Sequence, residues 1–216
     1  MKDPLRLAEM LAIRLCHDLS SPLGTLMGAL ELASEDVESS AEALRLADDI
    51  SATMGKRLRL LRAAWGGTAA DMAVDELRSL AEGAQRGRRV QLDLEDLDQS
   101  GRFTAAAARL TLNVLMLAIE SLPSGGLVAL SGDPAGDVLV TINGPRAAWP
   151  PGLAGYLVDQ EMAWDTLRKS EDFDASRNLA PLLTALTAHA SGLRVSMLMS
   201  ASAEMPPPLL LRLGEG

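Results

Sequence analysis

Residues 4–33, PLRLAEMLAIRLCHDLSSPLGTLMGALELA, contain the pattern from which the architecture of the chain follows. Apolar or small residues recur there at alternating intervals of three and four, and this spacing predicts one long amphipathic helix. The predicted inward face consists of Leu5, Ala8, Ala12, Leu15, Leu19, Pro22, Leu26, Ala29 and Ala33. We place the start of the helix at Pro4, because proline suits the first helical turn.

A second helical pattern spans residues 41–65, after the short polar segment 34–40. Its predicted inward face consists of Leu44, Ala47, Met54, Leu58, Leu61 and Trp65. The short connection predicts an antiparallel helical hairpin. Two helices alone cannot enclose a core, whereas two hairpins from two chains form a four-helix bundle, so we predict a homodimer.

The rest of the chain, after the joint Gly66-Gly67-Thr68, mixes helical and strand patterns. We predict helices at 74–84, 103–122 and 174–190, and strands at 90–94, 127–130, 138–142, 193–199 and 209–213. The prolines at 206–208 predict that the last of these is an edge strand. The expected fold class is α+β: a hairpin domain at 1–67, then an α/β sandwich at 68–216 with helices on one face of one sheet.

The composition of the chain excludes several classes of function. The chain has 216 residues, 48% of them hydrophobic, and a formal net charge of -9. This is too apolar for disorder and too acidic for non-specific binding to nucleic acid or an anionic membrane. A single cysteine fits a reducing compartment, and no apolar run reaches the ~20 residues of a membrane span, so we expect a cytoplasmic protein. With two histidines and one cysteine, we expect no zinc site built from His and Cys ligands within one chain.

His17 is the first candidate for chemistry. It lies between two inward-facing leucines in sequence, which places it on the outer face of the predicted helix. An exposed imidazole with a free ring nitrogen is a competent nucleophile. Ser21, Gly24 and Gly28 follow it on the same stripe. These small residues leave room for the surface of another protein. The alternative is that His17 is an ordinary polar surface residue.

The string His17-Asp18-Leu19-Ser20-Ser21-Pro22-Leu23 resembles the H-box of sensor histidine kinases. That box combines a phosphorylatable histidine, an acidic residue and, five residues after the histidine, a proline followed by an apolar residue. Three later segments are similar to the ATP-binding domain of the same kinases: 112–126 to the N-box helix, 138–145 to the first glycine box and 178–192 to the second. The resemblance implies a dimerisation and phosphotransfer hairpin followed by a kinase-like α+β domain.

The chain departs from the kinases at the positions that bind nucleotide. Leu117 replaces an asparagine that holds Mg²⁺, and leucine supplies no oxygen ligand. Ile142 replaces the aspartate that contacts adenine, and Arg146 replaces a glycine. The phosphate-loop glycines are also missing, with Arg177 and Asn178 in their region. Phosphate loops need glycine because backbone N–H groups must approach the oxygens closely.

An H-box and a kinase-like domain without a nucleotide site resemble the dimeric histidine phosphotransferases of the ChpT type. The resemblance implies that His17 takes a phosphoryl group from a phospho-aspartyl receiver domain of a hybrid kinase and passes it to receiver domains of response regulators. It implies no cofactor in this chain, since the receiver brings Mg²⁺. Asp18 would orient the imidazole, or be a solvated helix acid. The expected docking residues are Arg14, Ser21, Gly24 and Gly28, with Arg14 alternatively an ordinary exposed cation.

Two other functions stay open at this point. The chain could be a divergent sensor histidine kinase that uses ATP, which Mg·ATP binding would reveal. It could instead be a non-catalytic dimeric scaffold or anti-kinase, whose function would survive the loss of His17.

Overall fold

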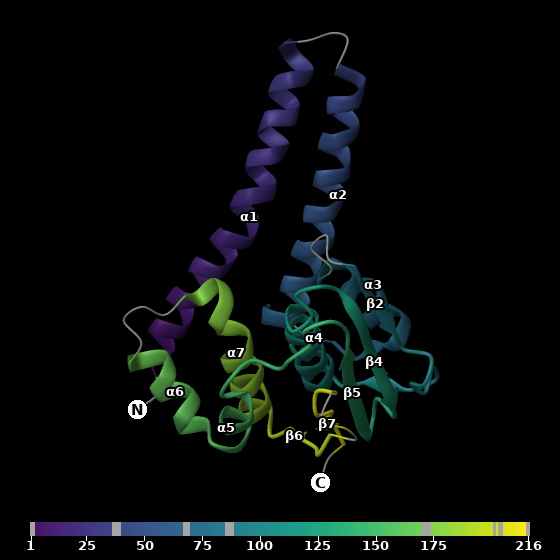
Figure 1. Cartoon of the computed structure of the whole chain (residues 1–216), viewed down its shortest axis with the longest axis vertical. Coiled ribbons are helices and arrows are strands. Elements are labelled where there is room, and N and C mark those ends of the chain that lie inside the picture. Colours follow the sequence, from purple (N-terminus) through teal and green to yellow (C-terminus); the bar gives the residue numbers. More distant parts are fainter. Residues whose placement is uncertain are drawn as a thin grey trace.

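The computed structural model describes residues 3–35, 40–66, 70–84, 89–169, 174–200, 202 and 205–214. Helix α1 (Pro4–Glu35) and helix α2 (Ser40–Trp65) form the N-terminal hairpin. Both agree with the predicted helices to within two residues. The hairpin is antiparallel, and its upper half projects well beyond the body of the molecule (Figure 1). The predicted α-hairpin is therefore confirmed.

The two helices meet along a narrower strip than the sequence pattern predicted. Small residues such as Ala29, Ala43 and Ala47 are buried between them. Leu5 and Leu44, predicted to face inward, are 71% and 51% exposed. A hairpin of two helices buries only the side chains along its line of contact, so the wider apolar faces of α1 and α2 stay open within one chain.

The α/β unit contains a five-stranded sheet in the order β2-β4-β5-β7-β6. Its strands are β2 (Val90–Asp93), β4 (Gly126–Gly132), β5 (Asp137–Asn143), β6 (Arg194–Met197) and β7 (Leu209–Arg212). Strand β2 runs parallel to β4, and the other neighbours are antiparallel. Strands β1 (Met72–Ala73) and β3 (Arg102–Phe103) form a separate antiparallel pair. The expectation that 209–213 is an edge strand was wrong, because β7 lies between β5 and β6.

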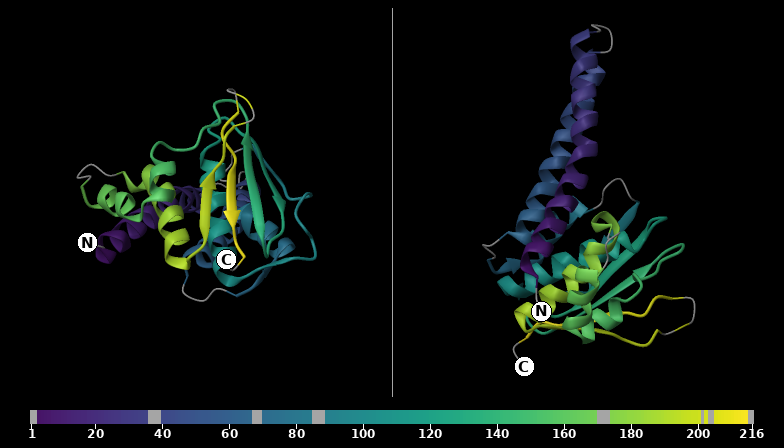
Figure 2. Two further views of the ribbon diagram at one scale, coloured as in Figure 1. Left: turned by 90° about the horizontal axis from the view of Figure 1, so that it is seen from below. Right: turned by 90° about the vertical axis from the view of Figure 1, so that its left-hand side faces the viewer.

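The helices lie on one face of this sheet, as predicted (Figure 2). They are α3 (Val74–Ala81) with the short 3₁₀ turn η1 (Glu82–Ala84), α4 (Ala105–Glu120), α5 (Leu153–Val158), α6 (Gln160–Lys169) and α7 (Ala175–Ser191). Helix α4 starts later than predicted, because Phe103 belongs to β3 and Thr104 caps the helix by accepting a hydrogen bond from the backbone of Ala107. Helices α5 and α6 were not predicted.

The base of the hairpin is part of the core of the α/β unit. Leu60, Leu61 and Ala64 of α2 belong to the same buried cluster as α4 and the sheet. A second buried cluster joins Met10 of α1 to Trp164 of α6 and to leucines of α7. The predicted domain boundary at 67/68 lies outside the described residues, so the division of the chain into two domains stays a prediction.

Along the described part of the chain, no helix combines the length and the apolar character needed to cross a bilayer.

Candidate functional site

His17 lies on α1 where the hairpin leaves the α/β unit. Its side chain is 60% exposed, as the helical pattern predicted. It lines a groove of about 870 Å³ between α1, α2 and η1. Lys56 and Glu82 lie on the opposite wall of this groove and form an exposed ion pair of 2.8 Å. The imidazole is thus accessible to a large partner.

Asp18 contrasts with its neighbour, because its side chain is completely buried. Its Oδ1 lies 3.5 Å from Nδ1 of His17. That separation is longer than a hydrogen bond but short enough for a strong electrostatic interaction. The interpretation of Asp18 as a solvated helix acid was therefore wrong. A carboxylate at this place favours a proton on Nδ1 and leaves the lone pair on Nε2.

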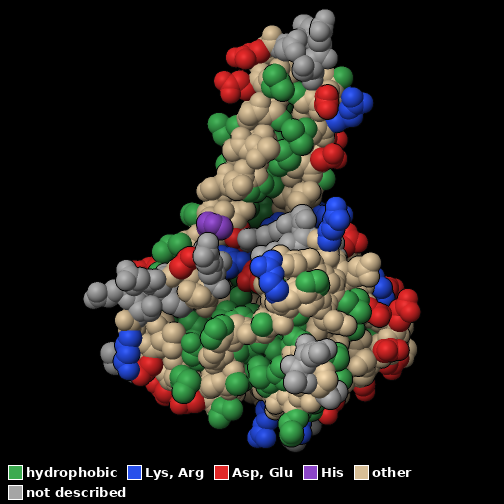
Figure 3. Space-filling model, in the orientation of Figure 1, with side chains coloured by type: hydrophobic (Ala, Val, Ile, Leu, Met, Phe, Trp, Pro, Cys, Tyr) green, Lys and Arg blue, Asp and Glu red, His purple; other side chains and the backbone are tan. Residues whose placement is uncertain are grey.

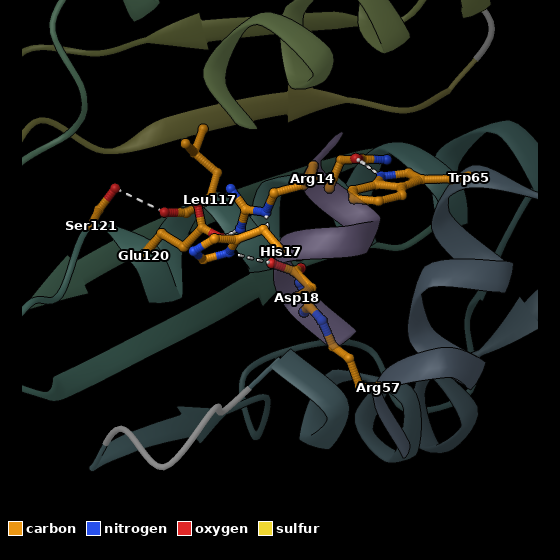
Figure 4. Close-up of polar contacts among 9 residues, drawn as sticks. Arg14, His17, Asp18, Arg57, Trp65, Leu117, Glu120 and Ser121 are labelled. Carbon is orange, nitrogen blue, oxygen red and sulfur yellow. Dashed lines mark hydrogen bonds and ion pairs between the residues drawn. The ribbon is translucent and has the colours of Figure 1, made fainter. Parts of the chain in front are cut away.

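Two arginines hold the buried carboxylate (Figure 4). Arg14 Nε donates to Asp18 Oδ1 at 3.1 Å, and Arg57 Nη2 donates to Asp18 Oδ2 at 2.7 Å. Arg14 also forms an ion pair through Nη2 with Glu120, the last residue of α4. The result is a chain of alternating charge, Glu120–Arg14–Asp18–Arg57, which we term the charge network.

Burial lowers the pKa of one member of the charge network, Arg57. Desolvation, with the positive charge of Arg14, lowers the pKa of Arg57 to about 10, and the negative charge of Glu120 acts in the opposite direction. Arg57 therefore stays protonated at neutral pH. The two cations and two carboxylates balance one another, which is the condition under which charges are tolerated inside a protein.

The expectation that Arg14 is an exposed docking residue was wrong, since only 3% of it is exposed. Met10, Arg14 and Asp18 follow one another at intervals of four, so they share one face of α1. That face packs against α2 and the α/β unit. The spacing of Arg14 and Asp18 was a visible signal for an ion pair. Arg57 and Glu120 were not predicted, because they lie 39 and 106 residues from their partners.

The small residues beyond His17 form an open surface. Ser21, Gly24 and Gly28 are all exposed on α1. A Cβ atom added at Gly24 or Gly28 would meet no other atom within 4 Å. The structure therefore brings His17 and these three residues onto one accessible stripe, whereas Arg14 and Asp18 lie behind it.

A second connection fixes the end of α2 to α4. Trp65 Nε1 donates to Asn113 Oδ1 at 2.9 Å, and the amide nitrogen of Asn113 donates to the Arg109 carbonyl at 2.9 Å. Arg109 Nη2 donates to the carbonyl of Gly66 at 2.8 Å. The base of the hairpin is thus held on the α/β unit at two places, the charge network and this hydrogen-bonded group.

The residues expected from the resemblance to replace nucleotide-binding groups are apolar or otherwise engaged. Leu117 and Ile142 are each 1% exposed and belong to the main core. Asn113, one turn before Leu117, has its side-chain amide committed to Trp65 and the helix backbone. Arg146 donates to Ser124 Oγ at 2.6 Å. Over the described residues, no cluster of three His, Cys, Asp or Glu side chains could hold a metal ion.

Comparison with known proteins identifies the family of this chain. The family model of the histidine phosphotransferase C-terminal domain matches residues 74–203, more than half of the chain. The chain belongs to the histidine phosphotransferase family and is of the ChpT type, a class that acts in two-component signalling.

One curated relative and one solved structure are similar to the chain over nearly its whole length, and the solved structure shows the same fold. Protein phosphotransferase ChpT of Brucella abortus (strain 2308) is 26% identical over 208 residues, which cover 89% of this chain and 90% of that protein. A bacterial phosphotransferase solved at 1.7 Å superposes with a TM-score of 0.74 and 22% identity over 98% of both chains. The mycobacterial sensor histidine kinase MprB is more distant, with a TM-score of 0.44 and 18% identity over 68% of this chain and 97% of that one.

Proposed function

We propose that this chain is the intermediate of a phosphorelay. His17 accepts a phosphoryl group from the phospho-aspartate of a receiver domain in a hybrid histidine kinase. It then passes the group to the aspartate of response-regulator receiver domains. The observation that carries this proposal is the pairing of an exposed imidazole with a buried, fully engaged carboxylate 3.5 Å away.

The transfer chemistry requires few groups of this chain besides His17 and Asp18. The Nε2 lone pair of His17 attacks phosphorus in line, an N–P bond forms, and the O–P bond of the acyl phosphate breaks. The electron pair of that bond leaves with the receiver aspartate. The imidazole keeps its Nδ1 proton and gains a positive charge, which the carboxylate of Asp18 stabilises. Transfers of this kind depend mainly on positioning and charge neutralisation.

The transfer needs no ATP and no cofactor held by this chain. Support comes from Leu117 and Ile142, whose side chains are buried in the core and offer no oxygen to magnesium or to the amino group of adenine. The Mg²⁺ ion that neutralises the phosphoryl group would arrive with the receiver domain.

The hairpin, residues 1–67, supplies both docking and dimerisation in this proposal. The receiver docks along Ser21, Gly24 and Gly28, where the surface is open. A second copy of the chain packs against the projecting part of the hairpin, where hydrophobic side chains are displayed (Figure 3). These include Leu23, Met27, Leu30, Leu32, Leu44 and Leu46, each at least 46% exposed. Two hairpins would bury these side chains as a four-helix bundle.

A transfer assay tests the proposal. The full chain is incubated with a receiver domain phosphorylated on aspartate and freed of ATP, and acid-labile phosphate on the chain is measured. The chain has two histidines, so His17→Ala and His189→Ala form a matched pair. We expect label on the wild type and on His189→Ala but none on His17→Ala.

The other outcomes would contradict the relay. No label from several receivers together with binding of Mg·ATP would favour a divergent kinase. No label and no nucleotide binding would favour a scaffold. Docking is tested separately with Gly24→Leu, which should slow transfer while the far-UV spectrum and the oligomeric state stay those of the wild type. An unchanged transfer rate would place the docking surface elsewhere.

A further inference from the structure

Glu120 connects the α/β unit to the phosphotransfer site. It ends α4, and its carboxylate pairs with Arg14 of α1, 106 residues earlier in the chain. The Arg14 side chain is 4% exposed and that of Glu120 is 22% exposed. The pair is therefore largely shielded from solvent, where an ion pair has more influence than on the surface.

Arg14 contacts Asp18 and Glu120 through two edges of one planar group. Nη2 faces Glu120, and Nε donates to Asp18 Oδ1. Oδ1 is also the oxygen that lies 3.5 Å from Nδ1 of His17. Because the guanidinium is rigid, an anchor at Nη2 fixes the direction of Nε and hence the carboxylate beside the imidazole (Figure 4).

We propose that Glu120 is a positioning residue for His17, acting from the α/β unit through Arg14 and Asp18. This inference rests on the proposed role of His17 as phosphoryl acceptor. This inference gives the α/β unit a function in the transfer itself. The α/β unit holds the carboxylate that selects the reactive tautomer of the imidazole.

The charges of the charge network give a second reason to expect that Glu120 affects the transfer. With Glu120 present, two carboxylates balance two guanidinium groups. Loss of Glu120 removes one negative charge from this network and leaves more positive charge beside an imidazole that must become positive during transfer. The loss of Glu120 would thus loosen the carboxylate and also oppose the developing charge.

The test compares three variants of the full chain. Glu120→Gln removes the charge at nearly constant shape, and Glu120→Asp keeps the charge. Trp65→Phe is the matched control, because it removes the hydrogen bond to Asn113 that also joins the hairpin to α4 but changes no charge. Single-turnover transfer from a phosphorylated receiver is measured over a range of receiver concentrations. ¹⁵N spectra of the imidazole report which ring nitrogen carries the proton.

For Glu120→Gln we expect a roughly tenfold lower maximal transfer rate at an unchanged half-saturating receiver concentration, and a larger fraction of the Nε2–H tautomer. Glu120→Asp should recover most of the rate, and Trp65→Phe should keep the wild-type tautomer. If Glu120→Gln folds less well, the double variant Arg14→Met/Glu120→Leu removes both charges, and it should still transfer slowly.

Three results would overturn the inference. In the first, Glu120→Gln has the wild-type rate and tautomer. In the second, Trp65→Phe slows transfer as much as Glu120→Gln with the same tautomer ratio, so that Glu120 merely holds two units together. In the third, the folded double variant transfers at the wild-type rate. A wild-type chain that takes no label on His17 would instead refute the proposed function, which keeps the two failures distinct.

Discussion

Replacement of Asp18 by asparagine should lower the free energy of unfolding by about 3–5 kcal/mol, the usual cost of removing one partner of a buried ion pair. The Asp18 side chain is fully buried and that of Arg57 is 8% exposed, with 2.7 Å between Nη2 and Oδ2. Arg14 keeps Glu120 in this variant. Arg57 loses the carboxylate, while its Nε is already buried without a hydrogen-bond partner among the described residues.

This loss is large enough for two independent measurements. For a chain of this length, about 3–5 kcal/mol corresponds to a fall in Tm of about 6–20 °C. Urea unfolding followed by far-UV circular dichroism gives the free energy directly, at one protein concentration because a dimer would make stability concentration-dependent. Asp18→Asn, Arg57→Met and the double variant complete a cycle, in which we expect a coupling energy of about 2–3 kcal/mol.

An exposed ion pair in the same groove provides the control. Lys56 and Glu82 are 2.8 Å apart, but their side chains are 48% and 52% exposed. Glu82→Gln should therefore change stability by no more than about 1 kcal/mol. If Asp18→Asn behaves like this control, or if the cycle gives no coupling, the carboxylate is not buried among arginines in solution. Asp18 could not then position His17.

Four further substitutions test other parts of the structure. Gly28→Ala, in open space on α1, should stabilise the chain by about 0.5–1 kcal/mol in urea unfolding. Gly126→Ala should destabilise it by about 2 kcal/mol or more, because φ is +145° and the new Cβ would lie 2.2 Å from the Asn143 carbonyl. Thr104→Ala removes the cap of α4 and should cost about 1 kcal/mol in the same assay. Leu30→Lys should give monomers in sedimentation velocity if the hairpins dimerise.

Much of the fold was predictable because its signals are local. Helices α1 and α2 are long enough for the spacing of three and four to repeat many times. Strands β4 and β5 are short apolar segments on either side of a turn that begins and ends with glycine. Helix α7 ends before Gly192, whose φ of +70° suits glycine, so its end was also visible in the sequence.

The elements that were missed or misplaced depend on tertiary packing. Helix α5 has six residues and α6 has ten, too few for a helical period to stand out. Residues 206–208 precede β7 rather than interrupt it, so prolines there remove no hydrogen bond from the ladder and are compatible with an inner strand. The order of the strands depends on which apolar faces pack together across the whole α/β unit. It therefore cannot be predicted from any short segment of the sequence.

The candidate site also has a part that the local sequence predicts and a part that depends on tertiary packing. The exposure of His17 and the open stripe beyond it follow from helical geometry alone. The burial of Arg14 and Asp18 does not, because it results from the packing of α1 against α2 and α7 and from the ion pair between Arg14 and Glu120 of α4. An exposed histidine would ordinarily have a mobile, solvated acid beside it. Here the acid is buried next to it instead, and a buried carboxylate requires compensating cations. One of those cations, Arg14, is itself paired with Glu120.

The need of the buried Asp18 carboxylate for fixed partners explains why the hairpin packs against the α/β unit. Asp18 affects His17 only if its carboxylate stays within a few ångströms of Nδ1 in one orientation, and a side chain on a free hairpin would rotate into water. Arg57 supplies one fixed partner from α2, and Glu120 supplies another, through Arg14, from α4. The α/β unit therefore has a structural role at the site, because it provides the rigid surface against which the charge network is held.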